Sequence, residues 1–209
     1  MEGHKKNIKV AGVDIANAER ILLMLHGRGG TAEDIISFAV AHLKQTSGTH
    51  IIAPQATNNS WYPNSFLAPV IENQPWLDSA LELLKEIMLD LEKKDINSNQ
   101  IFIIGFSQGA CLSLEFAARN AKHYGGVIAF TGGLIGEVLD NENYIGDFKN
   151  SKIFIGNSDR DAHVPLKRSE ESKRIMEKSG ANVTLKVYPG MGHTINEDEI
   201  NWVNQNILT

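Results

Sequence analysis

Cysteine is nearly absent from this 209-residue chain, which carries only Cys111. A single cysteine excludes an intrachain disulfide framework and fits a reducing compartment. No apolar run approaches the length of a membrane-spanning helix, so we expect no integral membrane segment. The amino-terminal stretch Met1–Lys6 is polar and no apolar segment follows it, which argues against an export signal. These absences together predict a cytoplasmic protein.

An excess of positive charge is also missing. Lys and Arg number 20 against 25 Asp and Glu, which gives a formal net charge of −5. A protein whose main partner is nucleic acid or an anionic membrane usually presents a basic surface. We therefore expect no nucleic-acid partner. The sequence leaves the oligomeric state open, with a homodimer as one alternative.

What the chain does contain is an alternation of short β-rich apolar runs with longer amphipathic ones. This pattern predicts an α/β fold, in which helices cover both faces of a mostly parallel central sheet. The length and the 42% hydrophobic content fit one domain over residues 1–209. Strands are predicted at Ile8–Val13, Ile21–Leu25, His50–Ala53, Gln100–Ile104, Val127–Thr131, Lys152–Gly156 and Val183–Tyr188. Helices are predicted at about 31–44, 75–91, 110–118, 165–180 and 196–207.

The most informative segment is Gly105–Gly109, a G-x-S-x-G pentapeptide between the apolar run Ile101–Ile104 and the helix-like stretch Ala110–Ala118. In this setting the pattern is the nucleophile elbow of the α/β-hydrolases, a sharp strand-to-helix turn that presents a serine. The glycines permit the strained backbone that such a turn requires. The context therefore favours Ser107 as a nucleophile over the alternative of a glycine-flanked serine that caps a helix.

A serine nucleophile needs a base within hydrogen-bond reach. In α/β-hydrolases the acid and then the histidine follow the serine along the chain, each after a later strand. His193 comes just after the last predicted strand, and the glycines before it let the backbone turn its ring toward the elbow. We therefore predict that His193 is the base. His163 precedes that strand and competes only weakly.

The acid should follow the strand at Lys152–Gly156, where two aspartates stand close together. The spacing does not separate Asp159 from Asp161, and Asp159 could equally cap the turn. With His163 they also form an Asp-x-Asp-x-His pattern that suits a metal ion. No further ligand motif accompanies it, so we expect no metal.

A catalytic serine also needs donors for the oxyanion. The residue after the nucleophile, Gln108, supplies one main-chain N–H, and the loop after an early strand supplies another. The glycine-rich segment His26–Gly30 follows the strand at Ile21–Leu25, so Arg28 N–H is the expected second donor. The alternative of a phosphate-binding loop is disfavoured because the segment has neither the spacing nor the lysine of a P-loop.

Two long irregular stretches, 54–74 and 132–150, follow predicted strands. Loops at the carboxyl side of parallel strands bind ligands in α/β folds, so their apolar side chains are predicted to line an acyl pocket. The alternative is a loop folded down over the core. The predicted pocket residues are Trp61, Phe66, Leu67, Leu134 and Ile135.

With these motifs the chain resembles the phospholipase/carboxylesterase family of small α/β-hydrolases, which includes the acyl-protein thioesterases. The resemblance rests on His26–Gly30, Ser60–Tyr62, Gly105–Gly109, Asp159–Pro165 and Gly190–His193. In the family's Asp-x-Asp-x-x-Val-Pro pattern the second aspartate is the acid, which implies Asp161. The resemblance also implies a fold without a large cap domain, no cofactor, and a small-molecule ester or thioester substrate that is hydrolysed through an acyl-enzyme.

The chain departs from that family at Arg28, where acyl-protein thioesterases usually carry leucine. A side chain that points to solvent is favoured there over one that binds an anionic substrate group. A lactone or C–C bond hydrolase of dienelactone type is the alternative reaction, although such enzymes typically use cysteine as nucleophile. A binding module without activity is disfavoured because Ser107, Asp161 and His193 are all present. Cys111 is expected to pack as a small buried hydrophobe.

Overall fold

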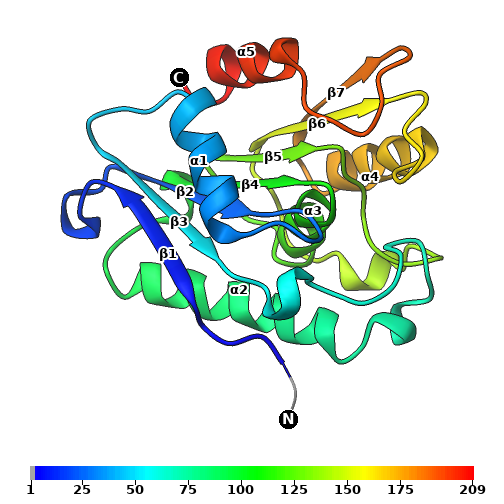
Figure 1. The fold of residues 1–209 in the computed structure, drawn as a ribbon, viewed down its shortest axis with the longest axis horizontal. Helices are drawn as coiled ribbons and strands as arrows, with labels where there is room; N and C mark the ends of the chain where they lie inside the picture. The colour runs from blue at the N-terminus through cyan, green and yellow to red at the C-terminus, as the bar shows by residue number, and fades with distance from the viewer. Residues whose placement is uncertain (1–2) are drawn as a thin grey trace.

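The computed structural model describes residues 3–209, and Figure 1 shows how its helices surround one sheet. The seven strands are ordered β1-β3-β2-β4-β5-β6-β7. Among the strand pairs within residues 3–209 only the edge pair β1 and β3 is antiparallel, so the predicted mostly parallel sheet is confirmed. Met1 and Glu2, part of the polar amino-terminal stretch, lie outside the described residues. The strands are β1 (Ile8–Gly12), β2 (Arg20–Leu25), β3 (Thr49–Pro54), β4 (Ile101–Phe106), β5 (Gly126–Phe130), β6 (Lys152–Ser158) and β7 (Asn182–Tyr188).

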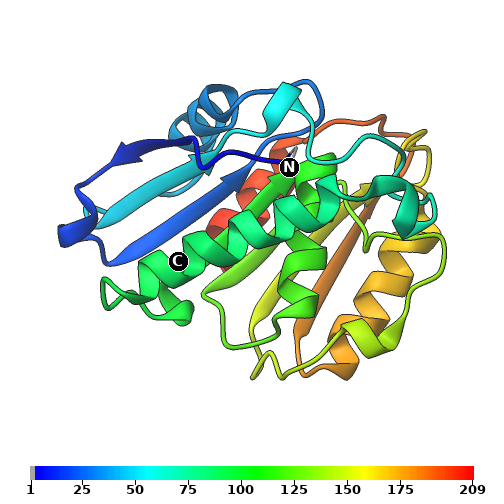
Figure 2. The ribbon, with the colours of Figure 1, turned by 90° about the horizontal axis from the view of Figure 1, so that it is seen from below.

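Helices cover both faces of the sheet, as the alternating sequence pattern predicts (Figures 1 and 2). Consecutive strand side chains point to opposite faces, so Leu23 belongs to one apolar cluster and Leu22 to the other. A parallel strand is therefore apolar on both sides, which explains the continuous runs in the sequence. One face carries α2 (Trp76–Glu92), α3 (Gln108–Arg119) and α4 (Leu166–Lys178), and the other carries α1 (Ala32–His42) and α5 (Glu197–Asn206).

Capping boxes fix the start of the two helices that follow the glycine-rich segments. At α1, the Thr31 hydroxyl accepts the N–H of Asp34 at 3.1 Å, and the Asp34 carboxylate accepts the N–H of Thr31 at 3.0 Å. At α5, Asn196 and Glu199 make the same reciprocal pair. A capping box stabilises a helix start by about 1 kcal/mol and sets the direction from which the chain enters. The loops 26–30 and 189–195 therefore end at defined points.

The longest connections, residues 55–75 and 131–151, leave the carboxyl ends of β3 and β5. They contain the short 3₁₀ helices η2 (Thr57–Asn59), η3 (Val70–Asn73) and η5 (Asn141–Asn143), and neither forms a cap domain within residues 3–209. None of the helices in that range has the length and apolar character needed to cross a membrane.

Candidate active site

Ser107 stands at the turn between β4 and α3, and its backbone is strained. Its φ of 55° and ψ of −119° lie in a region that non-glycine residues rarely adopt. The flanking glycines are sterically required. A Cβ on Gly105 would lie 2.3 Å from the carbonyl oxygen of Gly109, and one on Gly109 would lie 2.1 Å from that of Leu25. The turn is therefore tight enough to lift the Ser107 hydroxyl above the carboxyl edge of the sheet.

The structure brings Ser107, His193 and Asp161 together in one chain of hydrogen bonds. Ser107 Oγ lies 2.7 Å from His193 Nε2, and His193 Nδ1 lies 2.7 Å from Asp161 Oδ2. Both are hydrogen-bond distances. The first is short enough for His193 to take the proton of Ser107, and the second lets Asp161 orient the His193 ring. The His193 ring also contacts Phe106 and His163, at centroid distances of 5.3 and 4.8 Å. Its position is therefore fixed by packing as well as by hydrogen bonds.

The surroundings of Asp161 keep its carboxyl ionised. Burial disfavours the charge, but the N–H groups of Val164 and His163 donate to Oδ1 at 2.8 and 2.7 Å, and His193 donates to Oδ2. Together these donors outweigh burial and lower the pKa of Asp161. A carboxylate in this position can stabilise an imidazolium on His193.

Asp159, which the spacing alone left as an alternative acid, has another partner. Its Oδ1 accepts the main-chain N–H of Gly190 at 2.7 Å. The neighbouring Ser158 hydroxyl donates to the carbonyl of Met191. These contacts tie the loop before His193 to the end of β6, so Asp159 holds the backbone that carries the histidine.

The two expected oxyanion donors lie beside Ser107. Gln108 N–H opens the first turn of α3, where the helix dipole adds partial positive charge. Gly27 lies so close to the serine that a Cβ there would be 3.5 Å from Ser107 Cβ, and Arg28 follows it. Neither N–H, of Gln108 or of Arg28, donates to another main-chain group within residues 3–209. Both are therefore available to a substrate oxygen.

The Gln108 side chain connects the elbow to the loop after β3. Its Oε1 accepts the N–H of Trp61 at 2.9 Å, and its Nε2 donates to the carbonyl of Tyr62 at 2.8 Å. The sequence predicts only a main-chain role for Gln108. Its buried amide additionally fixes the wall of the site.

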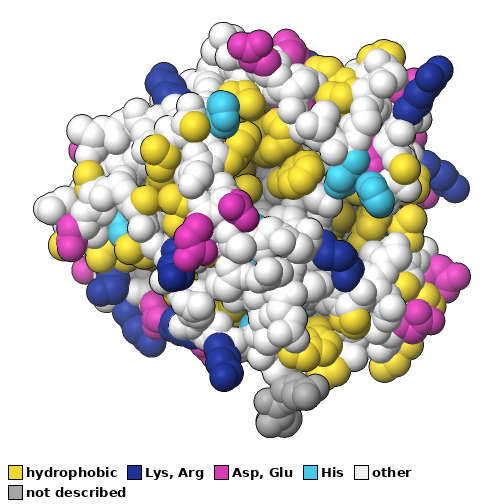
Figure 3. Space-filling model, in the orientation of Figure 1, with side chains coloured by type: hydrophobic (Ala, Val, Ile, Leu, Met, Phe, Trp, Pro, Cys, Tyr) yellow, Lys and Arg dark blue, Asp and Glu magenta, His cyan; other side chains and the backbone are white. Residues whose placement is uncertain are grey.

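A cavity of about 470 Å³ opens over Ser107. On the face shown in Figure 3, histidine side chains border a depression that has hydrophobic side chains nearby. Phe66 is the one predicted pocket residue that lines this cavity. The other apolar walls are Tyr62, Pro63, Cys111 and Val164, and the remaining lining residues are Arg28, Asn64, Ser65, Gln108, His163 and His193.

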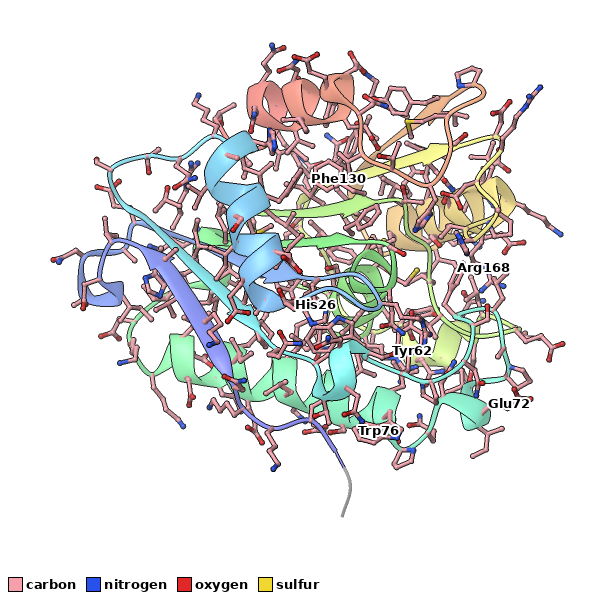
Figure 4. The ribbon with its side chains drawn as sticks, in the orientation of Figure 1. His26, Tyr62, Glu72, Trp76, Phe130 and Arg168 are labelled. Atoms are coloured by element: carbon pink, nitrogen blue, oxygen red, sulfur yellow. The ribbon has the colours of Figure 1, made fainter. Side chains whose placement is uncertain are left out.

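The prediction that Trp61 lines the acyl pocket is wrong. Its side chain is fully buried, the indole N–H donates to the carbonyl of His26 at 2.8 Å, and the ring packs on the His26 imidazole at 5.0 Å. The adjacent Tyr62 faces the cavity instead, and Figure 4 shows His26 and Tyr62 at the same end of the sheet. The Trp61-Tyr62 pair signals an aromatic wall, but the sequence does not show which member faces inward.

The predictions for Leu134 and Ile135 are also wrong, because the 134–137 segment is pinned against the core. Their N–H groups donate to Ser172 Oγ and Glu115 Oε2 at 2.8 and 2.9 Å. The Arg168 guanidinium, labelled in Figure 4, donates to the Leu134 carbonyl at 3.0 Å. Both side chains are consequently buried in the core.

Leu67 is a third correction to the predicted acyl pocket. It lines a separate groove with Pro165 and Arg168, and the Ser107 cavity does not include it. A turn closed by the hydrogen bond from Ala68 N–H to the Ser65 carbonyl, at 3.1 Å, has Phe66 and Leu67 at its centre, and only Phe66 lines the cavity with Ser107.

Arg28 does not simply point to solvent, as the sequence favoured. The residue is exposed, but its guanidinium donates to Ser60 Oγ at 3.1 Å and to the carbonyls of Pro63 and Asn64 at 2.8 and 2.7 Å. It also lies 5.9 Å from the Tyr62 ring centroid. Arg28 therefore braces the cavity wall. Its partners lie more than 30 residues away in the sequence, so no local sequence pattern predicts these contacts.

The chain is similar in sequence and structure to carboxylesterases and acyl-protein thioesterases. A model of the phospholipase/carboxylesterase family matches residues 13–209. The chain is 27% identical to acyl-protein thioesterase 1 of Saccharomyces cerevisiae, covering 89% of this chain and 90% of that protein. It is 25% identical to a probable SOBER1-like carboxylesterase of Arabidopsis thaliana, covering 89% and 77%. A crystal structure of a phospholipase/carboxylesterase from Dyadobacter fermentans is 54% identical, with a TM-score of 0.97 over 100% of this chain and 99% of that chain.

Proposed function

This chain belongs to the phospholipase/carboxylesterase family of α/β-hydrolases, and from that premise we propose that it hydrolyses carboxylic esters or thioesters through a Ser107, His193 and Asp161 triad. Membership of the family supports ester or thioester hydrolysis. The continuous hydrogen bonding from Ser107 Oγ through His193 to Asp161 is the observation that carries the assignment of residues.

In the acylation step, Ser107 Oγ attacks the substrate carbonyl carbon while His193 Nε2 removes the hydroxyl proton. The Asp161 carboxylate stabilises the imidazolium that forms but does not take its proton. The negative charge on the former carbonyl oxygen is met by the N–H groups of Gln108 and Arg28. His193 then gives its proton to the leaving oxygen or sulfur, and an ester between Ser107 and the acyl group remains.

Deacylation repeats these roles with water as nucleophile. His193 takes a proton from water, the hydroxide oxygen attacks the acyl carbon, and the proton passes to Ser107 Oγ as the acid departs. No step requires a group beyond the residues already named. The strained backbone of Ser107 holds the hydroxyl in place through both half-reactions.

Replacement of Ser107 by Ala tests the proposal. We expect turnover of p-nitrophenyl butyrate to fall by a factor on the order of 10³ or more, and we expect a fluorophosphonate probe to label the wild type at Ser107 but not the variant. Ser113→Ala, on the same helix, is the matched control and should retain labelling. Undiminished turnover by a folded Ser107→Ala protein would overturn the assignment.

The alternative reaction, on lactones or C–C bonds, uses the same kind of triad and needs a substrate comparison. We expect simple esters and acyl thioesters to be hydrolysed faster than dienelactones, because the nucleophile is a serine. A faster rate on a lactone at equal concentration would favour the alternative. Comparison of matched oxygen and sulfur esters of one acid will show which leaving group the enzyme prefers.

A further inference from the structure

The Arg28 side chain places a positive charge in the Ser107 cavity, and no carboxylate of residues 3–209 pairs with it. Its acceptors are one hydroxyl and two main-chain carbonyls. The residues that line the cavity include no Asp or Glu. An anion that entered the cavity would therefore meet one uncompensated cation.

The guanidinium also has free N–H donors and a fixed position from which to bind such an anion. It has five N–H donors, of which three are engaged by Ser60, Pro63 and Asn64, so two remain for a ligand. Those three bonds and the contact with the Tyr62 ring hold the side chain in one position before any ligand arrives. A fixed planar fork matches a carboxylate, and its binding costs little further ordering.

The position of Arg28 shows which part of a bound substrate its positive charge would face. Ser60 Oγ, which Arg28 contacts, lies 3.4 Å from Gln108 Nε2, and Gln108 directly follows the nucleophile. His193 approaches Ser107 from the loop after β7 and lies against His163. Because His193 must protonate the leaving group, the leaving group occupies the histidine side. The acyl part then faces the wall formed by Arg28 and residues 62–66.

On this basis, and resting on the proposed esterase function, we propose that Arg28 selects substrates whose acyl part ends in a carboxylate. Short dicarboxylic acids that carry one ester or thioester are the substrate class. Tyr62 and Phe66 close the acyl side of a cavity of about 470 Å³, which suits a short methylene chain. The two free N–H groups of Arg28 bind the distal carboxylate while Ser107 attacks the ester carbonyl.

The experiment compares substrates that differ only in the charge of the distal group. The p-nitrophenyl half-esters of glutaric and adipic acid are each measured against the corresponding methyl p-nitrophenyl diester, with Ser107→Ala protein as the background. For the wild type we expect kcat/KM for at least one half-ester to exceed that for its neutral partner by about tenfold, and added NaCl to reduce this ratio.

The ratio is then measured in Arg28→Met, in Arg28→Lys and in Lys167→Met, a basic position outside the cavity lining. We expect the ratio to fall to about one in Arg28→Met, to be intermediate in Arg28→Lys, and to be unchanged in Lys167→Met. Because the ratio is taken within each variant, any loss of shared catalysis cancels. A wild-type ratio of one or below, or a ratio retained in Arg28→Met, would overturn the proposal.

A second comparison places the carboxylate on the leaving group instead of on the acyl part. We expect butyrate esters of 4-hydroxybenzoate to show no advantage over those of methyl 4-hydroxybenzoate, and an advantage confined to this pair would also overturn the assignment to the acyl side. These outcomes differ from a failure of the proposed esterase function. If the protein were not an esterase, the Ser107-dependent turnover of the neutral esters would be absent as well.

Discussion

The indole N–H of Trp61 donates to the main-chain carbonyl of His26 at 2.8 Å, which ties the loop after β3 to the loop that carries Arg28 N–H. His26 Nε2 in turn accepts the main-chain N–H of Ala56 at 3.2 Å. Burial lowers the pKa of His26, which keeps this nitrogen free to accept. A buried aromatic residue that does not line the cavity thereby supports the loop of the proposed oxyanion donor.

Replacement of Trp61 by Phe should lower kcat more than it changes KM. The variant keeps most of the packing but leaves the His26 carbonyl without its donor, so the loop that positions Arg28 N–H relaxes. We expect kcat to fall by about tenfold and the free energy of unfolding by about 1 kcal/mol. Steady-state kinetics and urea denaturation measure the two effects.

Trp202→Phe is the matched control, because Trp202 stacks on Phe154 on the opposite face of the sheet. It should lose stability without a specific loss of kcat. An altered preference among acyl chain lengths in Trp61→Phe, at unchanged kcat, would instead indicate that Trp61 contacts the substrate.

The two aspartates of the acid loop should respond very differently to the same substitution. Asp161→Asn removes the charge beside His193 and presents an amide to its Nδ1–H, so kcat should fall by a factor on the order of 10³ to 10⁴. Asp159→Asn keeps an oxygen that accepts from Gly190 N–H, so kcat should change by less than about tenfold. Equal losses in both variants would show that the loop as a whole, rather than the Asp161 carboxylate, is required.

The fold, and the proximity of the three proposed triad residues, could be predicted from the sequence because both depend on local or topological signals. Buried parallel strands are continuous apolar runs, and capping residues mark the helix starts directly. Ser107, Asp161 and His193 each follow a different strand, and parallel topology brings the carboxyl ends of those strands to one edge. Their order along the chain therefore carries spatial information.

The cavity walls were not accessible in the same way. Whether Trp61 or Tyr62 faces inward depends on the Gln108 amide, which binds the backbone of both and is distant in sequence. Leu134 and Ile135 are apolar loop residues like Phe66, yet donors and acceptors from α3 and α4 hold them against the core. Such long-range contacts have no periodic pattern, so composition alone suggests a pocket where there is core.

Cys111 should be unreactive in the native protein although it lines the cavity wall. Burial raises the pKa of its thiol to about 12, so almost none is thiolate at pH 8. We expect no reaction with Ellman's reagent in the native state and release of one equivalent after denaturation in urea. Fast native labelling that is abolished in Cys111→Ala would show that the thiol is open to the cavity.

Glu199 should make the protein less stable as the pH rises through neutrality. The residue is fully buried, its Oε1 has no hydrogen-bond partner within residues 3–209, and it lies against Gly156. Burial, aided by the nearby charge of Asp198, raises the pKa of Glu199 from 4.5 to about 7. A carboxyl whose folded pKa is raised favours the folded state while it is protonated. Its ionisation therefore costs stability progressively between about pH 4.5 and 7, by up to about 3 kcal/mol.

Glu199→Gln tests this dependence, because the amide oxygen still accepts the N–H of Asn196 in the capping box while the charge is removed. Urea denaturation at pH 4.5, 6 and 8 gives the free energy of unfolding of each protein. The value for the variant should increase relative to that of the wild type as the pH rises, by up to about 3 kcal/mol across the range. Glu197→Gln, exposed in the same helical turn, should show no such trend. A difference between Glu199→Gln and wild type that stays constant with pH would mean that the pKa of Glu199 is the same in the folded and the unfolded chain. The pH profile of kcat should differ from the pH profile of stability, because Glu199 is not among the residues that line the Ser107 cavity.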